Sequence, residues 1–565
     1  MRTRPIMSTP SFADLFTPKL VTVLREGYGA GDLRADAVAG LTVAIVALPL
    51  SMAIAIASGT TPDRGLYTAI VGGFLVSLLG GSRFQIGGPA GAFIVLVAAT
   101  AARHGLEGLL LATFLSGLML LALGFLRLGT YVKFIPYPVT VGFTSGIAVI
   151  IFASQLRELF GLTLAGQEPG PILPKFQALF GALPTLNPAA LGVALFTILV
   201  IAGLRRWRPS WPSLLVAVTL ASALAALFGL PVETIGSRFG GIPGGLPAPA
   251  LPSFDPDLAL AVLPDAVSFT LLGAIESLLS AVVADGMSGR RHRSSMELVA
   301  QGAANLGSAL FGGICVTGTI ARTATNVRAG AKGPVAGMLH SLFLLLFMLF
   351  LAPLAAFIPL AALAGVLATV AWNMAERHVF LALLRASRGD ALVLLATFLL
   401  TVFRDLTEGI VVGFGLGALL FIKRMADATV VEAGVPSLDD RADREGDRAP
   451  YDAALHADPD FVVYRVSGAF FFGATAKVEA VLDRITGRHK ALVLDLAAVS
   501  VLDSTGANAI ETACRKAGRQ GVKVFIAGAP GPIRRVLKSH GLRPPLAAYA
   551  SGVEAAVAAA RRLPA

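Results

Sequence analysis

The sequence has few charged residues and almost no cysteine, and both shortages restrict the class of protein. Lys, Arg, Asp and Glu make up 14% of the 565 residues, whereas a soluble domain normally carries about 25%. Two cysteines, Cys315 and Cys514, are too few for a disulfide framework or a tetrahedral metal site. The seven histidines show no ligand spacing such as H-E-x-x-H. We therefore expect no metal, no cofactor and no catalytic residues.

Apolar residues dominate instead, at 55% of the chain, with a mean hydropathy of +0.74. The net charge of +11 fits Lys and Arg collected in cytoplasmic loops better than a nucleic-acid partner. Residues 1–35 read as a cytoplasmic N-terminal segment rather than a signal peptide, because the first long apolar run begins only near Asp36. Helical spacing of apolar residues predicts an interfacial helix there: Phe12, Leu15, Phe16, Leu20, Val23 and Leu24.

Apolar runs of membrane-spanning length recur across residues 36–425, which we predict to be a transmembrane transport domain. A helix needs about 20 residues to cross the hydrocarbon core. The two runs at 89–102 and 320–330 are too short to span alone. The fourteen predicted segments are 36–57, 64–81, 89–102, 107–126, 134–155, 188–204, 211–229, 264–286, 296–314, 320–330, 335–353, 356–373, 390–404 and 408–423.

The charges of the connecting loops predict the orientation. With the N-terminus in the cytoplasm, the inside loops hold most of the basic residues and the outside loops hold few. An even number of spans then returns the C-terminus to the cytoplasm. The inside loops contain Arg127, Lys133, Arg205, Arg206, Arg208, Arg290, Arg291, Arg293, Arg377, Arg385 and Arg388.

The two short segments are the candidate binding site. Each follows an extended stretch, opens with small residues, and stands third in its set of seven spans. Interrupted segments at matching positions of two halves point to a transporter's site. A helix that begins inside the membrane offers unpaired N–H groups and a positive dipole end to an anion. Glycines used only for helix packing are the alternative. The candidate residues are Gly88, Pro89, Ala90, Gly91, Thr319, Ile320, Ala321 and Arg322.

Two charged residues inside the predicted spans are further candidates. Glu276 lies midway along an apolar span, where a charge costs roughly 2.5–3.5 kcal/mol, and Ser280 follows one turn later. A coupling role in proton transfer is one interpretation, and a structural carboxyl between helices is the other. Arg322 would add its charge to a positive helix end, which is unfavourable unless an anion or Glu276 is near. A snorkelling arginine at the interface is the alternative.

After Arg424 the chain changes character. Residues 426–450 form a predicted linker, charged over 436–450, and residues 451–565 form a small domain. Strand-like runs at 461–466, 491–496 and 522–527 alternate with helical patterns at 475–485 and 505–519, which is typical of an α/β fold.

Four motifs together resemble the SulP family of anion transporters, which includes the prestin and pendrin group. The motifs are Gln85-Ile86-Gly87-Gly88-Pro89-Ala90-Gly91, Ala274-Ile275-Glu276-Ser277-Leu278-Leu279-Ser280, Ile320-Ala321-Arg322-Thr323-Ala324-Thr325-Asn326 and, in a tail similar to a STAS domain, Leu502-Asp503-Ser504-Thr505-Gly506.

The resemblance implies a polytopic α-helical fold of about fourteen spans in a 7+7 inverted repeat, with core and gate domains and a cytoplasmic STAS domain. It implies a multi-pass protein of the cell membrane, a homodimer, elevator-type transport, and an anion bound between spans 3 and 10 with Ile54 closing the pocket. Glutamate at 276 replaces the aspartate of a sodium-coupled relative and is similar to members thought to be proton-coupled. Sulfate, bicarbonate and C4-dicarboxylates stay open as substrates.

The resemblance also bears on the tail and on rival functions. In antagonist proteins with a STAS domain, the position of Thr505 is a phosphorylatable hydroxyl. Ser504 and Thr505 are therefore regulatory candidates, with helix capping as the alternative, and a cytosolic protein partner at this domain is expected. A nucleobase permease and a membrane sensor or scaffold acting through its STAS domain are the two alternative functions.

Overall fold

The computed structural model describes residues 12–130, 136–166, 168–208, 211–404, 406–427, 430–433, 461–471 and 490–563. The expected helix at 475–485, the charged stretch 436–450 and Lys133 lie outside the described residues. The chain divides into two compact units, residues 1–414 and 415–565, and the division falls within helix α19. Each unit is described by itself.

The first half of the membrane part contains two interrupted helical segments. A π-helical turn, η1 (Thr68–Gly72), joins α4 (Pro62–Tyr67) to α5 (Gly73–Leu79). The short strand β1 (Gly87–Gly88) then leads into the 3-10 turn η2 (Gly91–Phe93). The remaining helices of this half are α3 (Ala30–Ala57), α6 (Ile94–Phe125), α7 (Tyr137–Phe160), α8 (Ile172–Gly181), α9 (Pro188–Trp207), α10 (Ser213–Leu227) and α11 (Ile235–Phe239).

The second half repeats this order. Strand β2 (Thr317–Gly318) precedes the short helix α14 (Ile320–Arg328), as β1 precedes η2. The other helices are α12 (Pro256–Ser288), α13 (Ser294–Leu310), α15 (Val335–Ala355), α16 (Leu360–Met374), α17 (Arg377–Ala386), α18 (Arg388–Phe403) and α19 (Leu406–Asp427). Each of the fourteen predicted segments therefore has a helical counterpart.

Helix α6 contains two of the predicted segments. It runs for 32 residues, but Gly105 breaks it with φ 66°, a left-handed conformation that glycine adopts without steric penalty. The predicted segments 89–102 and 107–126 lie on either side of this break. Seven helical segments of the described residues are long and apolar enough to cross a membrane by themselves; the others are short or interrupted.

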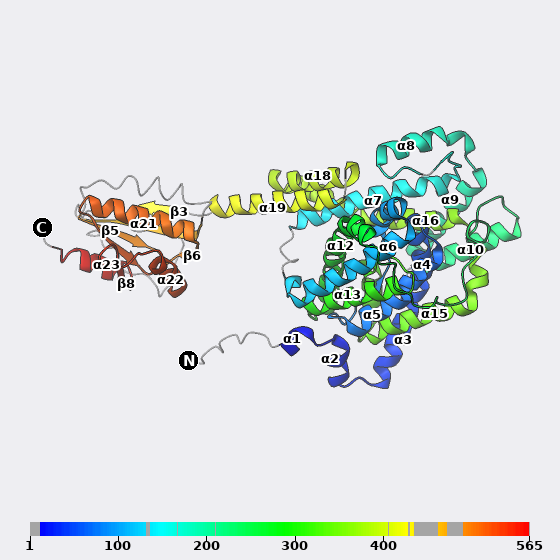
Figure 1. Ribbon diagram of the computed structural model, residues 1–565, viewed down its shortest axis with the longest axis horizontal. Coiled ribbons are helices and arrows are strands. Elements are labelled where there is room, and N and C mark those ends of the chain that lie inside the picture. Colours follow the sequence, from blue (N-terminus) through cyan, green and yellow to red (C-terminus); the bar gives the residue numbers. More distant parts are fainter. Residues whose placement is uncertain are drawn as a thin grey trace. The chain divides into compact units, whose positions relative to one another are not determined.

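Helices of the first half pack against helices of the second half in corresponding pairs. Helix α3 packs against α15 as α12 packs against α6, and α7 packs against α18 as α16 packs against α9. Figure 1 shows α6, α12 and α13 side by side in the first unit. The helices form two groups: α3–α6 with α12–α15, and α7, α9, α10, α16 and α18. These two groups correspond to the core and gate domains that the resemblance implies, and we call them the core and gate groups.

The N-terminal segment differs from the single predicted helix. Two short helices, α1 (Phe12–Phe16) and α2 (Lys19–Arg25), flank Pro18. Proline lacks the N–H that a continuous helix needs and disfavours helical geometry in the preceding residue. Helix α2 is held against the loop after α5, because Lys19 N donates to Gly80 O at 2.9 Å and Arg83 pairs with Glu26.

The second unit contains an α/β domain, as predicted. Strands β3 (Val430–Ala433), β4 (Phe461–Phe470), β5 (Ala491–Asp495), β7 (Lys523–Ala527) and β8 (Ala548–Ala550) form a sheet in this order, and β6 (Val499–Leu502) pairs with β4. The described helices are α21 (Ser504–Arg519), α22 (Gly531–Ser539) and α23 (Val553–Ala560).

Strand β3 corrects the predicted linker. It lies inside residues 426–450, yet it pairs antiparallel with β4 and forms one edge of the sheet. Its β-branched residues Val430 and Val431 favour a strand. A strand of four residues beside a charged stretch at 436–450 gives little sequence signal of its own.

Candidate anion-binding site

Strands β1 and β2 meet within the helix group α3–α6 and α12–α15, at a place that we call the crossover. They pair antiparallel, with Gly87 opposite Gly318 and Gly88 opposite Thr317. The segments η2–α6 and α14 therefore leave the crossover in opposite directions, and both N-terminal ends lie at it. First-turn N–H groups without intrahelical partners and two positive dipole ends thus meet at one place.

Side chains of α12 and α14 hold the first strand in position. The Ile86 carbonyl accepts hydrogen bonds from the backbone and hydroxyl of Thr319, at 2.9 and 3.1 Å. The Ile86 N–H donates to Thr323 Oγ1 at 3.1 Å, and that hydroxyl also bonds Ser280 Oγ at 3.1 Å. The Ser280 hydroxyl therefore bonds α14 through Thr323.

Arg322 lies in the first turn of α14 and is only 1% exposed. Its Nη2 donates to Ser51 Oγ of α3 at 3.1 Å and to the Pro89 carbonyl at 3.3 Å. A methyl group added to Gly88 would overlap with its Nη1. The guanidinium is therefore packed against the crossover, and the alternative of a snorkelling arginine is wrong.

No carboxylate of the described residues forms an ion pair with Arg322, and its Nε and Nη1 have no hydrogen-bond partner there. A buried, unpaired charge is costly and is normally compensated by an opposite charge or by hydrogen bonds. Glu276 forms no ion pair with Arg322, so among the described residues the guanidinium is a positive charge without a carboxylate partner beside two positive helix ends.

The predicted binding residues differ in accessibility. Gly88, Pro89, Ala90 and Thr319 are buried, whereas Ala321 is exposed and Gly91 and Ile320 are partly exposed. A methyl group built on Gly91 would lie 3.1 Å from Ile151 Cδ1 of α7 and 3.7 Å from Met374 Sδ of α16. The start of η2 therefore faces the helices α7 and α16.

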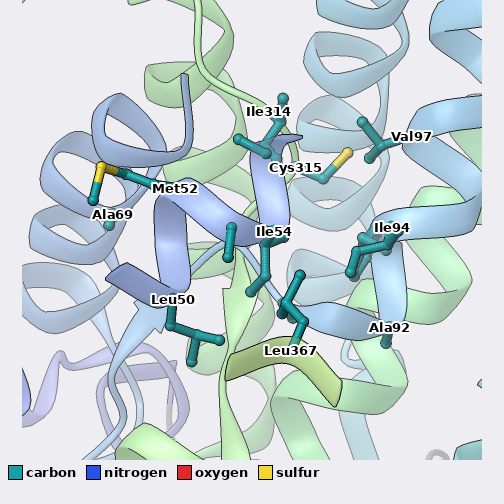
Figure 2. Close-up of a cluster of buried hydrophobic side chains, with 14 of the residues drawn as sticks. Leu50, Met52, Ile54, Ala69, Ala92, Ile94, Val97, Ile314, Cys315 and Leu367 are labelled. Carbon is teal, nitrogen blue, oxygen red and sulfur yellow. The ribbon is translucent and has the colours of Figure 1, made fainter. Parts of the chain in front are cut away.

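Ile54 of α3 belongs to the apolar cluster of the membrane part. Its side chain lies among those of Leu50, Ile94, Cys315 and Leu367 (Figure 2). Leu367 is on the gate helix α16, and Ile54 is therefore at the boundary between the two helix groups. This side chain can exclude water from the crossover but offers no hydrogen bond.

Glu276 lies at the same boundary, on α12. It lines a small apolar cavity together with residues of α7, α14 and α19: Val139, Thr140, Phe143, Thr144, Ile275, Leu279, Ile320 and Ile410. Ile320, at the start of α14, connects this cavity to the crossover. A carboxyl here stands where the core and gate helices meet.

The regulatory candidates lie in the second unit, at the start of α21. Ser504 and Thr505 are exposed, and the helix cap is Asp503, whose Oδ1 accepts from Gly506 N at 2.7 Å. Capping by Ser504 or Thr505 is therefore wrong, because the carboxylate one position earlier takes that role. Both hydroxyls are accessible beside a positive helix end.

Sequence reasoning missed two residues of the site. Ser51 receives the Arg322 hydrogen bond, and Thr323 connects Ile86 with Ser280. Ser51 is a polar residue in an otherwise apolar stretch, which is the signal that could have found it; Thr323 lies among other polar residues of α14, and its position in the sequence gives no such signal. No group of three or more His, Cys, Asp or Glu side chains in the described ranges could hold a metal ion.

The fold and the crossover define a polytopic helical transporter with an attached STAS domain. The sequence profile of the Sulfate permease family matches residues 33–397, and that of the STAS domain matches residues 452–555. The chain belongs to the sulfate permease family, a family of anion transporters rather than enzymes.

Individual relatives cover nearly all of the chain. The putative sulfate transporter YvdB of Bacillus subtilis is 38% identical over 92% of this chain and 95% of its own. The bicarbonate transporter BicA of Picosynechococcus is 32% identical over 90% of both chains.

Solved structures agree in fold. The murine anion transporter Slc26a9 superposes with a TM-score of 0.84 at 19% identity, covering 99% of this chain and 97% of its own. The transmembrane domain of a cyanobacterial BicA has a TM-score of 0.62 at 34% identity, covering 68% of this chain and 98% of its own.

Proposed function

We propose that this protein is a secondary active transporter that moves a small oxyanion, sulfate or bicarbonate, across the cell membrane together with a proton. C4-dicarboxylates remain in the candidate set because two helix ends and one guanidinium accept any compact anion. The observation that carries the proposal is the buried Arg322, which lacks a carboxylate partner among the described residues at the crossover of β1 and β2. The names of the relatives support sulfate and bicarbonate as the first anions to test.

The proposed anion site lies between the N-terminal ends of η2 and α14. The N–H groups near Ala90 and Ala321 contact the anion, Arg322 supplies the opposite charge, and Ile54 excludes water on the gate side. Glycines 88 and 91 allow close approach to the backbone. The remaining site residues, Pro89, Thr319 and Ile320, shape the two helix starts.

Transport then requires that the site change its access. In an elevator-type movement the core helices carry the anion past the gate helices α7 and α16. Glu276 lines a cavity between these groups, so its charge affects their sliding contact. A protonated carboxyl can cross an apolar boundary at much lower cost than a carboxylate. This gives Glu276 the coupling role, with Ser280 positioning the neighbouring α14.

The wider assembly follows from the same proposal. The protein acts as a homodimer in the cell membrane with both termini in the cytoplasm, and its STAS domain binds a cytosolic protein partner. Thr505, exposed at the positive end of α21, is the proposed phosphorylation site, because a phosphate there would meet unpaired N–H groups. Neither a nucleobase permease nor a scaffold function is favoured by a specific observation.

Uptake into proteoliposomes tests the proposal. Purified protein is reconstituted and presented with radiolabelled sulfate, bicarbonate, succinate and uracil, with and without an inward proton gradient. We expect one oxyanion to accumulate only when the outside is acidic. Uracil uptake, or no anion uptake by folded protein, would contradict the proposal.

Glu276→Gln separates coupling from binding. Glutamine keeps the shape of the side chain but cannot release a proton. We expect exchange of anion across the membrane to continue while acid-driven accumulation is lost. Undiminished pH-driven accumulation by this variant would exclude Glu276 as the proton carrier, and anion transport itself would stand.

A further inference from the structure

The long connection between α10 and α12 has no role in the transport scheme above. Three connections join the core group to the gate group: residues 126–136 between α6 and α7, residues 228–255 between α10 and α12, and residues 356–359 between α15 and α16. The second of these contains the short helix α11, and the structure describes all of it. The contacts along this connection show which of its parts belongs to which helix group.

The first part of this connection is bonded to the gate group. Asn187, which caps α9, donates from Nδ2 to the Pro231 carbonyl at 2.7 Å. Arg238 of α11 pairs through Nη1 with Glu158 Oε1 of α7 at 2.6 Å. Val232 packs against the apolar cluster formed by α7, α9, α10 and α16. Helix α11 and the residues before it are therefore fixed to the gate group.

Helix α11 is also tied to the connection between α15 and α16. Ile235 N donates to the Ile358 carbonyl at 2.9 Å. Leu360 N donates in turn to the Glu233 carbonyl at 2.9 Å. These backbone hydrogen bonds leave residues 356–359 little freedom to extend, so the C-terminal end of α15 is held beside the gate group.

The last part of the long connection is bonded to the core group instead. Ala250 N donates to the Leu310 carbonyl at the end of α13, at 2.8 Å. Ser253 Oγ donates to Glu107 Oε2 of α6 at 3.0 Å. The two ends of one connection are thus held by two different helix groups.

Residues 241–249 lie between these two fixed parts and form no hydrogen bond with any described residue. Gly240 and Gly241, where the segment begins, have φ angles of 75° and 104°, which glycine adopts without steric penalty. A methyl group added to Gly244 or Gly245 would meet no atom within 4 Å. A segment whose backbone is unbonded and loosely packed has low local stability, so it can change its conformation at little cost.

The contacts that the segment does make are apolar. Ile242 and Leu246 are partly buried and pack against the apolar cluster of the membrane part. Apolar contacts have no preferred direction, so they can be exchanged as one surface slides past another. Three residues of the segment have no N–H group to satisfy in any conformation: Pro243, Pro247 and Pro249.

We propose that residues 241–249 are the hinge of the transport movement. As the core group moves against the gate group, this segment changes its backbone conformation, while α11 stays with the gate group and residues 250–253 stay with the core group. The C-terminal end of α15 then acts as the pivot, because its short connection to α16 is tied to α11. The inference rests on the proposed function, since the elevator-type movement is part of that function.

Distances between spin labels test this assignment. Both native cysteines are buried, so a cysteine introduced at an exposed position takes the label selectively. Four exposed positions suit the experiment: Leu199 on α9, Glu233 before α11, Ala250 after the proposed hinge, and Arg291 before α13. The last two lie near opposite ends of α13, whose 17 residues span about 25 Å, a distance that pulsed electron paramagnetic resonance measures well.

Three double variants are labelled and measured in proteoliposomes. Leu199→Cys with Glu233→Cys reports on the gate group, and Ala250→Cys with Arg291→Cys reports on the core group. Glu233→Cys with Arg291→Cys reports across the hinge. Each is measured without anion and with saturating sulfate or bicarbonate, at neutral and acidic pH. We expect two distances across the hinge, with populations that depend on anion or pH, and one constant distance in each of the other pairs.

Stiffening the segment gives an independent measurement. In the double variant Gly244→Pro and Gly245→Pro, the new prolines remove no hydrogen bond and extend Pro243 into a semi-rigid polyproline run. We expect its Vmax for uptake to fall about tenfold or more, with the KM changed by less than about twofold. Gly244→Ala with Gly245→Ala is the matched control, because both positions are open, and it should keep the wild-type Vmax.

Three results would each overturn the inference while wild-type transport persists: a single, constant distance across the hinge; a shift in the core pair as large as the shift across the hinge; or equal Vmax values for the proline and alanine variants. Wild-type protein that takes up no anion of the panel would instead reject the proposed function, and the hinge with it. Wild-type uptake therefore distinguishes the two failures.

Discussion

Replacing Gly88 by alanine adds one methyl group at the point where the crossover meets Arg322. The new Cβ would overlap with Nη1 and lie 3.5 Å from Cζ of the guanidinium and 3.7 Å from Cα of Ala69. The position of the methyl group is fixed by the backbone of residue 88. The guanidinium must therefore move, and Nη2 leaves its positions at 3.1 Å from Ser51 Oγ and 3.3 Å from the Pro89 carbonyl.

The expected magnitude follows from these contacts. Inserting a methyl group into a packed interior typically costs about 1–3 kcal/mol. A hydrogen bond to a charged group is worth about 1.5–3 kcal/mol, and the contact to Pro89 is long enough to contribute little. If the lost contact reappears as lost anion affinity, the KM rises roughly 10- to 150-fold.

Proteoliposome uptake at several anion concentrations measures this change. Gly286→Ala on α12 is the matched control, because a methyl group there meets no atom within 4 Å and alanine favours the helix. The decisive comparison is Gly88→Ala in an Arg322→Lys background, where the forked head group is absent. An equal effect of Gly88→Ala in both backgrounds, or a wild-type KM in the single variant, would refute the reasoning.

Two further predictions concern the second unit. Burial raises the pKa of the Cys514 thiol to about 12, so at pH 8 only about one molecule in ten thousand carries the reactive thiolate; iodoacetamide should label Cys514 only when urea unfolds the domain, and rapid labelling of native protein, detected by mass spectrometry, would contradict this. Deleting residues 451–565 should leave detectable uptake while changing rate or expression, because the crossover lies wholly within the first unit. A folded, membrane-inserted truncation that binds no anion would show that the transport machinery extends into the tail.

The sequence was sufficient for the order of the membrane segments. Apolar runs and the small residues around Gly88 and Gly318 mark the helices and their interruptions, because membrane insertion leaves a strong signal in composition. The sequence did not predict two features, the break in α6 and the strand β3. Gly105 breaks α6 through a left-handed φ of 66° that a run of apolar letters does not reveal, and β3 depends on a partner strand distant in the chain.

The electrostatic character of the site needed the structure. Arg322 could be placed in the first turn of a half-helix from its motif, but burial and partners depend on contacts across 271 residues to Ser51 and 233 to Pro89. Sequence periodicity carries no information at that separation.

Under the proposed function, the lack of a carboxylate partner for Arg322 among the described residues would also let the site release the anion that it binds. A carboxylate held against the guanidinium would neutralise it, and an arriving anion would have to displace that carboxylate inside the membrane, at the cost of leaving it unpaired. Neutral partners such as Ser51 and the Pro89 carbonyl orient the guanidinium without cancelling its charge. In the proposed scheme a bound anion would compensate the charge of Arg322. After the anion leaves, the guanidinium would keep its neutral hydrogen bonds to Ser51 and Pro89. Glu276 lines a cavity with residues of α7, α14 and α19 and forms no ion pair with Arg322 among the described residues. In the proposed scheme its protonation would therefore alter the movement of the core without competing for the anion.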